Sequence, residues 1–129
     1  MIGVVATAAG AFAVDLETEE VGPWDGSVEP DPAPELGLPR VVSAAASGST
    51  VVALVDAKPP LLVSHDAGTT WRESGRGLPA GTAVALGDDP DVVLYAARNR
   101  LYLSRDGGLF WSALSVELPE ISALVLREA

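Results

Sequence analysis

Apolar residues occur along the whole chain in short alternating or continuous runs, and clusters of Gly, Pro, Asp and Asn separate these runs. Runs of this kind are typical of β-strands bounded by turns. A sustained 3.6-residue apolar pattern, as expected for a helix, does not develop because Gly or Pro interrupts every window of about a dozen residues. The chain is therefore predicted to be all-β, with strands at residues 3–8, 11–16, 21–24, 41–46, 51–55, 61–64, 70–73, 82–86, 92–97, 101–104, 110–114 and 121–126.

Two independent markers repeat along the sequence with one period. The pair Leu-Pro recurs at a spacing of 40, at residues 38–39, 78–79 and 118–119. The pattern SxDxGxxW recurs at the same spacing, at residues 64–71 and 104–111. Agreement between two markers indicates an internal structural repeat of about 40 residues, which is the usual size of a four-stranded propeller blade.

The first repeat unit is degenerate. Trp24 lies 47 residues before Trp71, which predicts a seven-residue insertion within residues 25–37. The three prolines of that segment indicate a stiff surface loop. The first unit also lacks an innermost strand, whereas residues 121–126 align with the innermost strand at 82–86. The C-terminus is therefore expected to supply the strand that the N-terminus lacks.

A period near 40 with four strands per unit is the signature of a β-propeller. We expect a single domain of three four-stranded blades, which corresponds to half of a ring. The predicted blades comprise residues 1–38 together with 120–129, residues 39–78, and residues 79–119. The alternative fold is a sandwich of about a dozen short strands, in which the constant spacing would be a coincidence.

With these motifs, the chain resembles the Asp-box or BNR-repeat propellers, a family that includes sialidases, sortilin-type receptors and photosystem II assembly factors. The similarity is clearest in residues 88–111, where an acidic-Pro turn, a VLYAA strand and an SxDGGxxW hairpin follow one another. The resemblance implies that the boxes are structural and lie at the blade periphery. Carboxylates there accept backbone N–H bonds, glycines supply positive φ, and Trp rings are buried between sheets. The structural box residues are Ser64, Asp66, Gly68, Trp71, Ser104, Asp106, Gly108 and Trp111.

The composition narrows the classes of function. The 129 residues include 18 acidic and 8 basic side chains, for a net charge of −10, and no cysteine. A surface this acidic argues against nucleic acid as a partner, and the lack of cysteine excludes disulfides and thiolate chemistry. No apolar run is long enough to span a membrane. The apolar residues 1–10 have no preceding positive charge and indicate a strand instead of a secretory signal, so the expected compartment is the cytoplasm.

No catalytic site is predicted. Sialidase chemistry, as the resemblance implies it, needs three arginines on a carboxylate, a Tyr activated by a Glu, and an Asp acid/base. The loops of one face offer Arg76, Arg98 and Arg100, but Tyr95 and Tyr102 lie in strands. We therefore expect no enzyme activity.

No metal site or cofactor is predicted either. The acidic cluster Asp88, Asp89 and Asp91 lacks the alternating spacing and the closing Glu of a calcium loop. His65 is the single histidine and lies in a box turn that is expected to be exposed. Both features are therefore interpreted as solvated turns.

The predicted function is that of a non-enzymatic scaffold that binds another protein. In the usual blade order, the Pro-rich residues 25–37 should share one face with the loops at residues 58–60, 76–81 and 98–100. Exposed loops rich in Pro and Arg form a natural contact surface. The predicted binding residues are Trp24, Lys58, Arg76, Arg98 and Arg100. The alternative is a sialidase-like propeller that binds or hydrolyses a glycan at the channel mouth, with Trp24 as a candidate stacking platform.

Three blades are too few for a closed ring, because propellers contain about four to eight. Two copies related by a two-fold axis would supply six blades, so a homodimer is expected. In this prediction residues 121–126 of each subunit insert beside residues 3–8 of the other.

Overall fold

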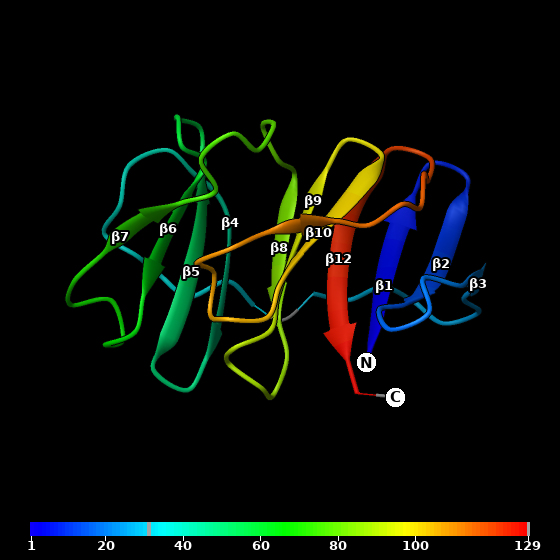
Figure 1. Ribbon diagram of the computed structural model, residues 1–129, viewed down its shortest axis with the longest axis horizontal. Coiled ribbons are helices and arrows are strands. Elements are labelled where there is room, and N and C mark those ends of the chain that lie inside the picture. The colour runs from blue at the N-terminus through cyan, green and yellow to red at the C-terminus, as the bar shows by residue number, and fades with distance from the viewer. Residues whose placement is uncertain (31, 129) are drawn as a thin grey trace.

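The computed structural model describes residues 1–30 and 32–128, which form twelve strands arranged in three four-stranded antiparallel sheets (Figure 1). Asp31 of the Pro-rich segment and Ala129 of the predicted first blade lie outside the described residues. The predicted all-β class with three four-stranded blades is confirmed. None of the described residues form a helix that is long and apolar enough to cross a membrane.

Each sheet is one blade, with its strands running in order from the innermost to the outermost. Blade 1 consists of β12 (Ile121–Arg127), β1 (Ile2–Thr7), β2 (Gly10–Asp15) and β3 (Val21–Pro23). Blade 2 consists of β4 (Val41–Ser47), β5 (Thr50–Val55), β6 (Leu61–Ser64) and β7 (Arg72–Ser74). Blade 3 consists of β8 (Ala83–Leu86), β9 (Val93–Ala97), β10 (Arg100–Ser104) and β11 (Ser112–Ala113).

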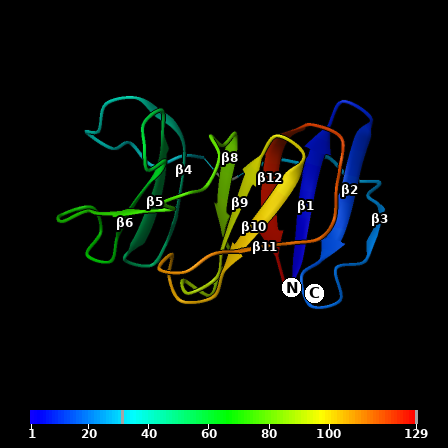
Figure 2. The same ribbon diagram turned by 45° about the horizontal axis from the view of Figure 1, so that its top comes forward.

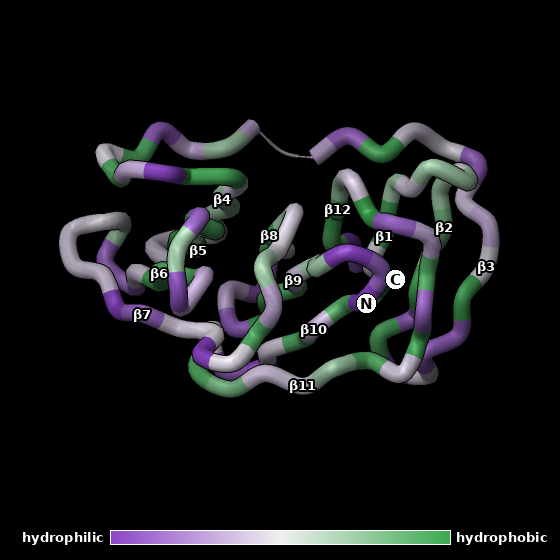
Figure 3. Tube along the Cα trace, turned by 90° about the horizontal axis from the view of Figure 1, so that it is seen from above, coloured by the Kyte–Doolittle hydropathy of each residue, from purple (hydrophilic) through white to green (hydrophobic). Residues whose placement is uncertain are grey.

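The blades form an arc in which blade 3 lies between blades 2 and 1 (Figures 1 and 3). One apolar core fills the space between blades 3 and 1, and Leu94, Leu101 and Leu124 lie in it almost without exposure. A second core fills the space between blades 2 and 3 around Leu54 and Tyr95. Sheets stacked through alternating inward residues bury both faces of blade 3, which is the blade with a neighbour on each side.

The two chain ends meet in blade 1. Strand β12 pairs antiparallel with β1 of the same chain, from Ile2 opposite Arg127 to Thr7 opposite Ile121, with one irregularity near Thr7. Figure 2 shows both termini at the same end of this blade. The predicted exchange of residues 121–126 into a second subunit is therefore wrong. Residues 114–120 lead from the outer strand of blade 3 directly into the adjoining blade 1, so β12 reaches β1 of its own chain.

Strand β12 should contribute strongly to stability because it is the innermost strand of blade 1 and faces blade 3. Leu124 is 2% exposed within the core between these blades. We expect Leu124→Ala to lower the free energy of unfolding by about 2–5 kcal/mol, the usual result of removing a fully buried Leu. Urea unfolding followed by circular dichroism measures the change.

The exposed Ser122, two residues earlier on the same strand, provides the control. Ser122→Ala should change the free energy of unfolding by less than about 1 kcal/mol, because only one exposed hydrogen bond, from Ser122 Oγ to Ala6 O, is removed. Equal losses in the two variants would mean that β12 is not packed against blade 3.

Candidate functional site

The loops lie at two opposite ends of the arc. The first end, called the basic face, is formed by the turns between the second and third strands and by the connections between blades. These are residues 8–9, 56–60, 75–82, 98–99 and 114–120. The second end, called the acidic face, is formed by the turns between the first and second and between the third and fourth strands. These are residues 16–20, 48–49, 65–71, 87–92 and 105–111.

Charge is divided unequally between these two ends. Among the eight basic residues of the chain, the basic face and its margins hold Arg40, Lys58, Arg76, Arg98 and Arg100. The acidic residues in the loops of that face are Asp56, Glu117 and Glu120. The acidic face and its margins hold Asp15, Glu17, Glu19, Glu20, Asp66, Asp88, Asp89, Asp91, Asp106 and Glu128. Within its loops this end has three basic and three acidic residues, and Arg40 and Arg100 at its margins add two positive charges, so a chain of net charge −10 presents one end that is close to balanced and one that is strongly acidic.

Four predicted binding residues belong to the basic face. Lys58 lies in the β5–β6 turn, Arg76 in the β7–β8 connection and Arg98 in the β9–β10 turn, and all three are exposed. Arg98 adopts φ of 55°, and its carbonyl oxygen accepts a hydrogen bond from Ile121 N at 2.6 Å. Arg100 Nη2 lies 2.9 Å from Glu117 Oε1, which neutralises one positive charge of this face.

Trp24 lies at the end of β3, and its indole Nε1 donates to Ser27 O at 3.4 Å. The spacing of the tryptophans predicts that Trp24 is the first-unit equivalent of Trp71 and Trp111, and this prediction is wrong. Those two residues directly precede β7 and β11, whereas Trp24 directly follows β3. The connection that follows, from Trp24 to β4, is correspondingly longer than the other links between blades.

The Pro-rich segment does not join the basic face. Its described residues cross the arc along the innermost strands β12, β8 and β4, on the side where a propeller has its channel (Figure 3). The prediction that residues 25–37 share a face with Lys58 and Arg98 is therefore wrong. The reason is topological: β3 lies at one end of the arc and β4 at the other, so the connection spans the inner side of all three blades.

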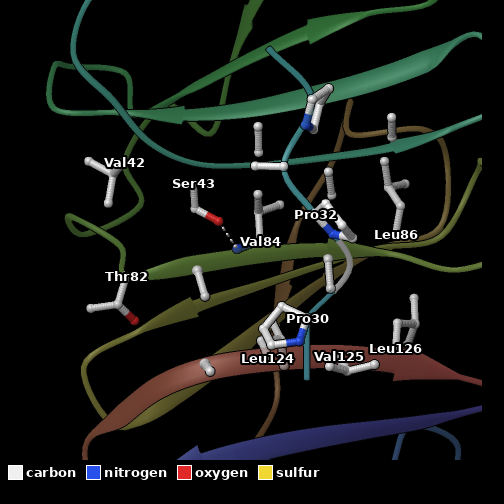
Figure 4. Close-up of a pocket in the computed structure, with 18 of the residues that line it drawn as sticks. Pro30, Pro32, Val42, Ser43, Thr82, Val84, Leu86, Leu124, Val125 and Leu126 are labelled. Carbon is white, nitrogen blue, oxygen red and sulfur yellow. Dashed lines mark hydrogen bonds between the residues drawn. The ribbon is translucent and has the colours of Figure 1, made fainter. Parts of the chain in front are cut away.

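A cavity of about 360 Å³ lies between this segment and the innermost strands (Figure 4). Its lining consists of Pro30, Pro32, Ala33 and Pro34 on one side and residues 42–46, 82–86 and 122–126 on the other. Polar groups of this wall already have partners: Ser43 Oγ accepts from Val84 N at 3.4 Å, and Thr82 Oγ1 donates to Ile121 O at 3.0 Å. Because no described lining residue is titratable, the wall offers no general acid or base.

The first Asp-box turn is held by Ser64, Asp66 and Thr70. Ser64 Oγ donates to Asp66 Oδ1 at 2.7 Å and accepts from Gly68 N at 2.8 Å. Asp66 Oδ1 also accepts from Thr70 N at 2.8 Å, and Thr70 Oγ1 donates to Oδ2 of the same carboxylate at 2.5 Å. Gly68 adopts φ of 90°, a backbone conformation that L side chains rarely adopt. Both oxygens of this carboxylate are therefore engaged in closing the turn.

The second box repeats the serine and backbone bonds, but Phe110 has no hydroxyl to donate as Thr70 does. Ser104 Oγ donates to Asp106 Oδ1 at 2.8 Å and accepts from Gly108 N at 2.9 Å, and the same Asp106 oxygen accepts from Leu109 N and Phe110 N. The hydrogen bonds from Thr70 and Ser64 lower the pKa of Asp66 to about 2. Those from Phe110 N and Ser104 lower the pKa of Asp106. Each carboxylate is stabilised in its charged form, which suits an anchor and not a proton donor.

The box tryptophans are not equivalent. Both rings were expected to be buried, but both are only half-buried. Trp111 packs on the core between blades 2 and 3, and its Nε1 donates to Ser74 Oγ at 3.1 Å. Trp71 belongs to neither of the two cores. The difference arises because Trp111 faces blade 2, whereas Trp71 faces the open end of the arc.

Tyr95 is a structural residue of blade 3. It is fully buried, its hydroxyl donates to Pro79 O at 2.6 Å, and its ring lies 6.0 Å from the rings of Tyr102 and Trp111. Burial, assisted by Tyr102, raises the pKa of Tyr95 to about 12. A Cβ at Gly81 would collide with the Tyr95 ring, so only glycine fits where this connection crosses the tyrosine.

The remaining candidates stay apart. Asp89 Oδ1 accepts from Asp91 N at 3.0 Å within the β8–β9 turn, and His65 Nδ1 lies 3.4 Å from Thr50 Oγ1 on the exposed β6–β7 turn. Within residues 1–30 and 32–128, no three His, Asp or Glu side chains converge in a manner that would hold a metal ion.

Two features of the site are not predicted from the sequence. Arg40 joins the basic face because its carbonyl oxygen accepts from Asp56 N at 3.0 Å, which ties the start of β4 to the β5–β6 turn. Phe110, which is 79% exposed, borders a hollow of about 450 Å³ that Arg76 and Trp111 also line. The sequence does distinguish Phe110, because the equivalent position of the first box holds the polar Thr70 and a large apolar residue is therefore not required by the box itself.

Comparison with known proteins agrees with the fold and leaves the function open. Neither a protein-family profile nor a curated protein sequence matches the chain. Among solved structures, it is similar to a GH74 enzyme of Niastella koreensis, with 25% identity and a TM-score of 0.52 over 89% of this chain and 17% of that one. It is also similar to YCF48 bound to D1 peptide, with 21% identity and a TM-score of 0.52 over 93% of this chain and 39% of that one.

The class of protein defined by the fold is thus the β-propeller, of which the described chain forms three blades. The chain spans less than half the length of either of these two structures.

The bonds of the Asp66 carboxylate predict a pH-dependent contribution to stability. Its pKa of about 2 in the folded chain lies below the ordinary value of 3.8, so folding favours the charged form. The resulting stabilisation is complete above about pH 4 and is lost as the pH falls through about 2. We expect Asp66→Asn to be less stable than the parent at pH 7, with a difference that shrinks between pH 4 and pH 2.

Urea unfolding midpoints at several pH values measure this difference. Asp56→Asn, which removes one negative charge outside both boxes, controls for the change in net charge. A gap between Asp66→Asn and the parent that stays constant down to pH 2 would contradict the assigned bonds.

Proposed function

We propose that this chain is a non-enzymatic propeller scaffold whose basic face binds an acidic, extended segment of another protein. The observation that carries the proposal is the concentration of exposed Lys and Arg at one end of a chain whose net charge is −10. Charge separated in this way steers an acidic partner to one end and repels it from the other. The likeness to YCF48 bound to D1 peptide supports a propeller that takes a peptide ligand.

The basic face has the chemistry for carboxylate recognition. Arg76 and Arg98 present planar guanidinium groups from neighbouring loops, and a guanidinium can bind a carboxylate through two parallel hydrogen bonds. Lys58 adds a compact positive charge on the next blade. Because these groups are exposed, each contributes modestly, and affinity depends on several acidic residues binding together.

The alternative function is a propeller that binds or hydrolyses a glycan, and it draws support from the likeness to the GH74 enzyme. We favour the non-enzymatic function because of where the reactive side chains lie. Tyr95 is buried with its hydroxyl on Pro79 O, and the carboxylates of Asp66 and Asp106 close turns on the acidic face, away from Arg98. The box carboxylates are thus separated from the arginines, and Tyr95, a candidate nucleophile, is inaccessible to a substrate because it is fully buried.

We further propose that two copies assemble into a six-bladed ring. Each chain supplies three blades whose arc is open at blade 1 and at blade 2, and rings of about four to eight blades are the known closed forms. A two-fold axis would pair each open end with the complementary end of the other copy. The basic faces of both copies would then lie on the same side of one ring, which doubles the number of basic loops available to a partner.

Binding is tested with fluorescein-labelled peptides. A peptide of alternating Glu and Ala should raise the fluorescence anisotropy on addition of the protein, and added salt should weaken this binding. Arg76→Ala combined with Arg98→Ala should weaken binding by roughly tenfold or more, because two charged contacts are lost together.

The matched control removes two positive charges elsewhere, with Arg72→Ala and Arg127→Ala. This control should bind the acidic peptide like the parent, and a peptide of alternating Gln and Ala should bind to neither. Equal weakening in both double variants would show that net charge alone, and not the basic face, controls binding.

Enzyme activity is tested separately. A fluorogenic sialoside should be hydrolysed no faster in the presence of the protein than in buffer, because Tyr95 is buried and the box carboxylates lie on the opposite face from Arg98. Turnover that disappears in Arg98→Ala or Arg100→Ala would overturn the non-enzymatic proposal in favour of the glycosidase alternative.

A further inference from the structure

The second Asp-box turn is docked on the neighbouring blade. Trp111 Nε1 donates to Ser74 Oγ of blade 2, and that hydroxyl in turn donates to Gly108 O. A Cβ placed at Gly108 would lie 3.1 Å from Val63 Cγ2 of blade 2, so the turn is in close contact with that sheet. The SxDxGxxW turn of blade 3 thus acts as a connector that fastens this blade to the blade before it.

The first Asp-box turn has the same internal bonds but lacks a blade to dock on. A Cβ placed at Gly68 would meet only the ring of Trp71, which belongs to its own turn, at 3.5 Å. Trp71 is half-buried, as Trp111 is, but it lies outside both described cores. Blade 2 is at one end of the arc, so the place that blade 2 fills for Trp111 is open for Trp71.

Blade 1, at the other end of the arc, exposes the complementary surface. Hydrogen bonds define the equivalent positions: Trp24 N donates to Ala11 O at 3.0 Å, as Leu114 N donates to Leu101 O at 2.9 Å. In blade 2, the residue paired with the corresponding Leu61 is Ser74. Trp24 therefore occupies the place in blade 1 that Ser74, the acceptor of Trp111, occupies in blade 2.

The two faces of blade 1 differ in burial: on the face turned away from blade 3 the central Val4 is 1% exposed, but its neighbours are less buried than their counterparts on the other face. Along β12, Leu124 and Leu126 face blade 3 and are buried, whereas Ala123 and Val125 alternate with them and are only half-buried. Ala11 and Ala13 on β2 lie on the same face of blade 1 as Ala123 and Val125. Both alanines are half-buried too.

The surface of blade 2 that contacts the second box turn and the equivalent surface of blade 1 differ in side-chain size. One position is smaller in blade 1 and the other is larger. By the strand register, Ala13 corresponds to Val63 and Trp24 corresponds to Ser74. A smaller side chain thus stands where the Gly108 turn meets Val63, and a larger one stands where Trp111 meets Ser74. An incoming box turn therefore finds room over Ala13 and its indole finds an aromatic neighbour in Trp24, and aromatic pairs of this kind favour offset or edge-to-face contact.

We infer that the first Asp-box turn of one copy docks on blade 1 of a second copy, with its Gly68 over Ala13 and its Trp71 beside Trp24 of that copy. The occupant is a second copy of this chain, because the same molecule carries both the undocked connector and the free surface. Under a two-fold axis the contact occurs twice and closes the ring without leaving an open end. The inference rests on the proposed six-bladed ring and names the residues that hold it together.

Light scattering coupled to size-exclusion chromatography tests the inference on the 129-residue protein over a range of concentrations. The parent should elute with twice the chain mass of 13.2 kDa. Trp71→Ala and Trp24→Ala should each weaken dimerisation by at least about tenfold, as the loss of a central aromatic contact does. Circular dichroism should show that both variants keep the β-sheet signal of the parent.

Trp111→Phe is the matched control, because it changes the equivalent ring at a contact made within one chain. This variant should lose thermal stability and still dimerise with the affinity of the parent. A parent that is dimeric while Trp71→Ala dimerises equally well would overturn the Trp71 contact and leave the ring intact. A parent that stays at 13.2 kDa at every concentration would overturn both the contact and the ring.

Anisotropy with the peptide of alternating Glu and Ala separates these results from the scaffold proposal. Monomeric Trp71→Ala should still bind this peptide through Arg76 and Arg98, although with fewer basic loops per particle. Loss of dimerisation with retained peptide binding supports the Trp71 contact and the basic face independently. Loss of peptide binding in a folded Trp71→Ala monomer would contradict the proposal that one basic face binds the peptide without the ring.

Discussion

The pairing of β12 with β1 is the constraint from which the rest of the architecture follows. It places the first and last strands of the chain in one sheet and places that sheet beside blade 3. Blade 2, which follows blade 1 in the sequence, is then at the far end of the arc. The connection between β3 and β4 must consequently cross all three blades on their inner side, where a closed propeller has its channel.

The composition of the innermost strands permits this crossing. Residues 44–46, 83–85 and 123 are mostly Ala, so the Pro-rich backbone can lie close to the sheets. Ser43, Thr82 and Ser122 satisfy neighbouring backbone groups instead of projecting free polar atoms. The described lining of this inner cavity therefore carries no charged side chain, whereas the loops at the two ends of the arc carry many of them.

The repeat pattern was sufficient to predict the strands, the three blades and the use of the C-terminal strand in blade 1, because these depend on local alternation and on one period. The path of residues 25–37 was not predictable in this way, since it depends on which blades are neighbours in space. The same limit applies to Trp71 and Trp111. Their sequence contexts are alike, and only the presence of blade 2 beside Trp111 makes their environments differ.

Of the candidate site, the sequence located the basic residues of the loops but not their segregation from the acidic ones. The expected blade order did predict that the loops of Lys58, Arg76 and Arg98 share one face, although these residues are spread over 40 residues of sequence. Trp24 was aligned with the wrong position because the spacing of tryptophans alone does not distinguish the start of a strand from its end.

The joining of the two chain ends also determines the order in which the protein can fold. Strands β1 to β3 are synthesised first, but β1 has an unpaired inner edge until β12 has been made. Exposed strand edges are templates for pairing with other chains. Blade 2 and blade 3 are contiguous in sequence and can form while synthesis continues, whereas blade 1 depends on contacts between opposite ends of the chain, which form slowly because a long loop must close. The blade that comes first in the described chain therefore needs the last strand of that chain to be complete.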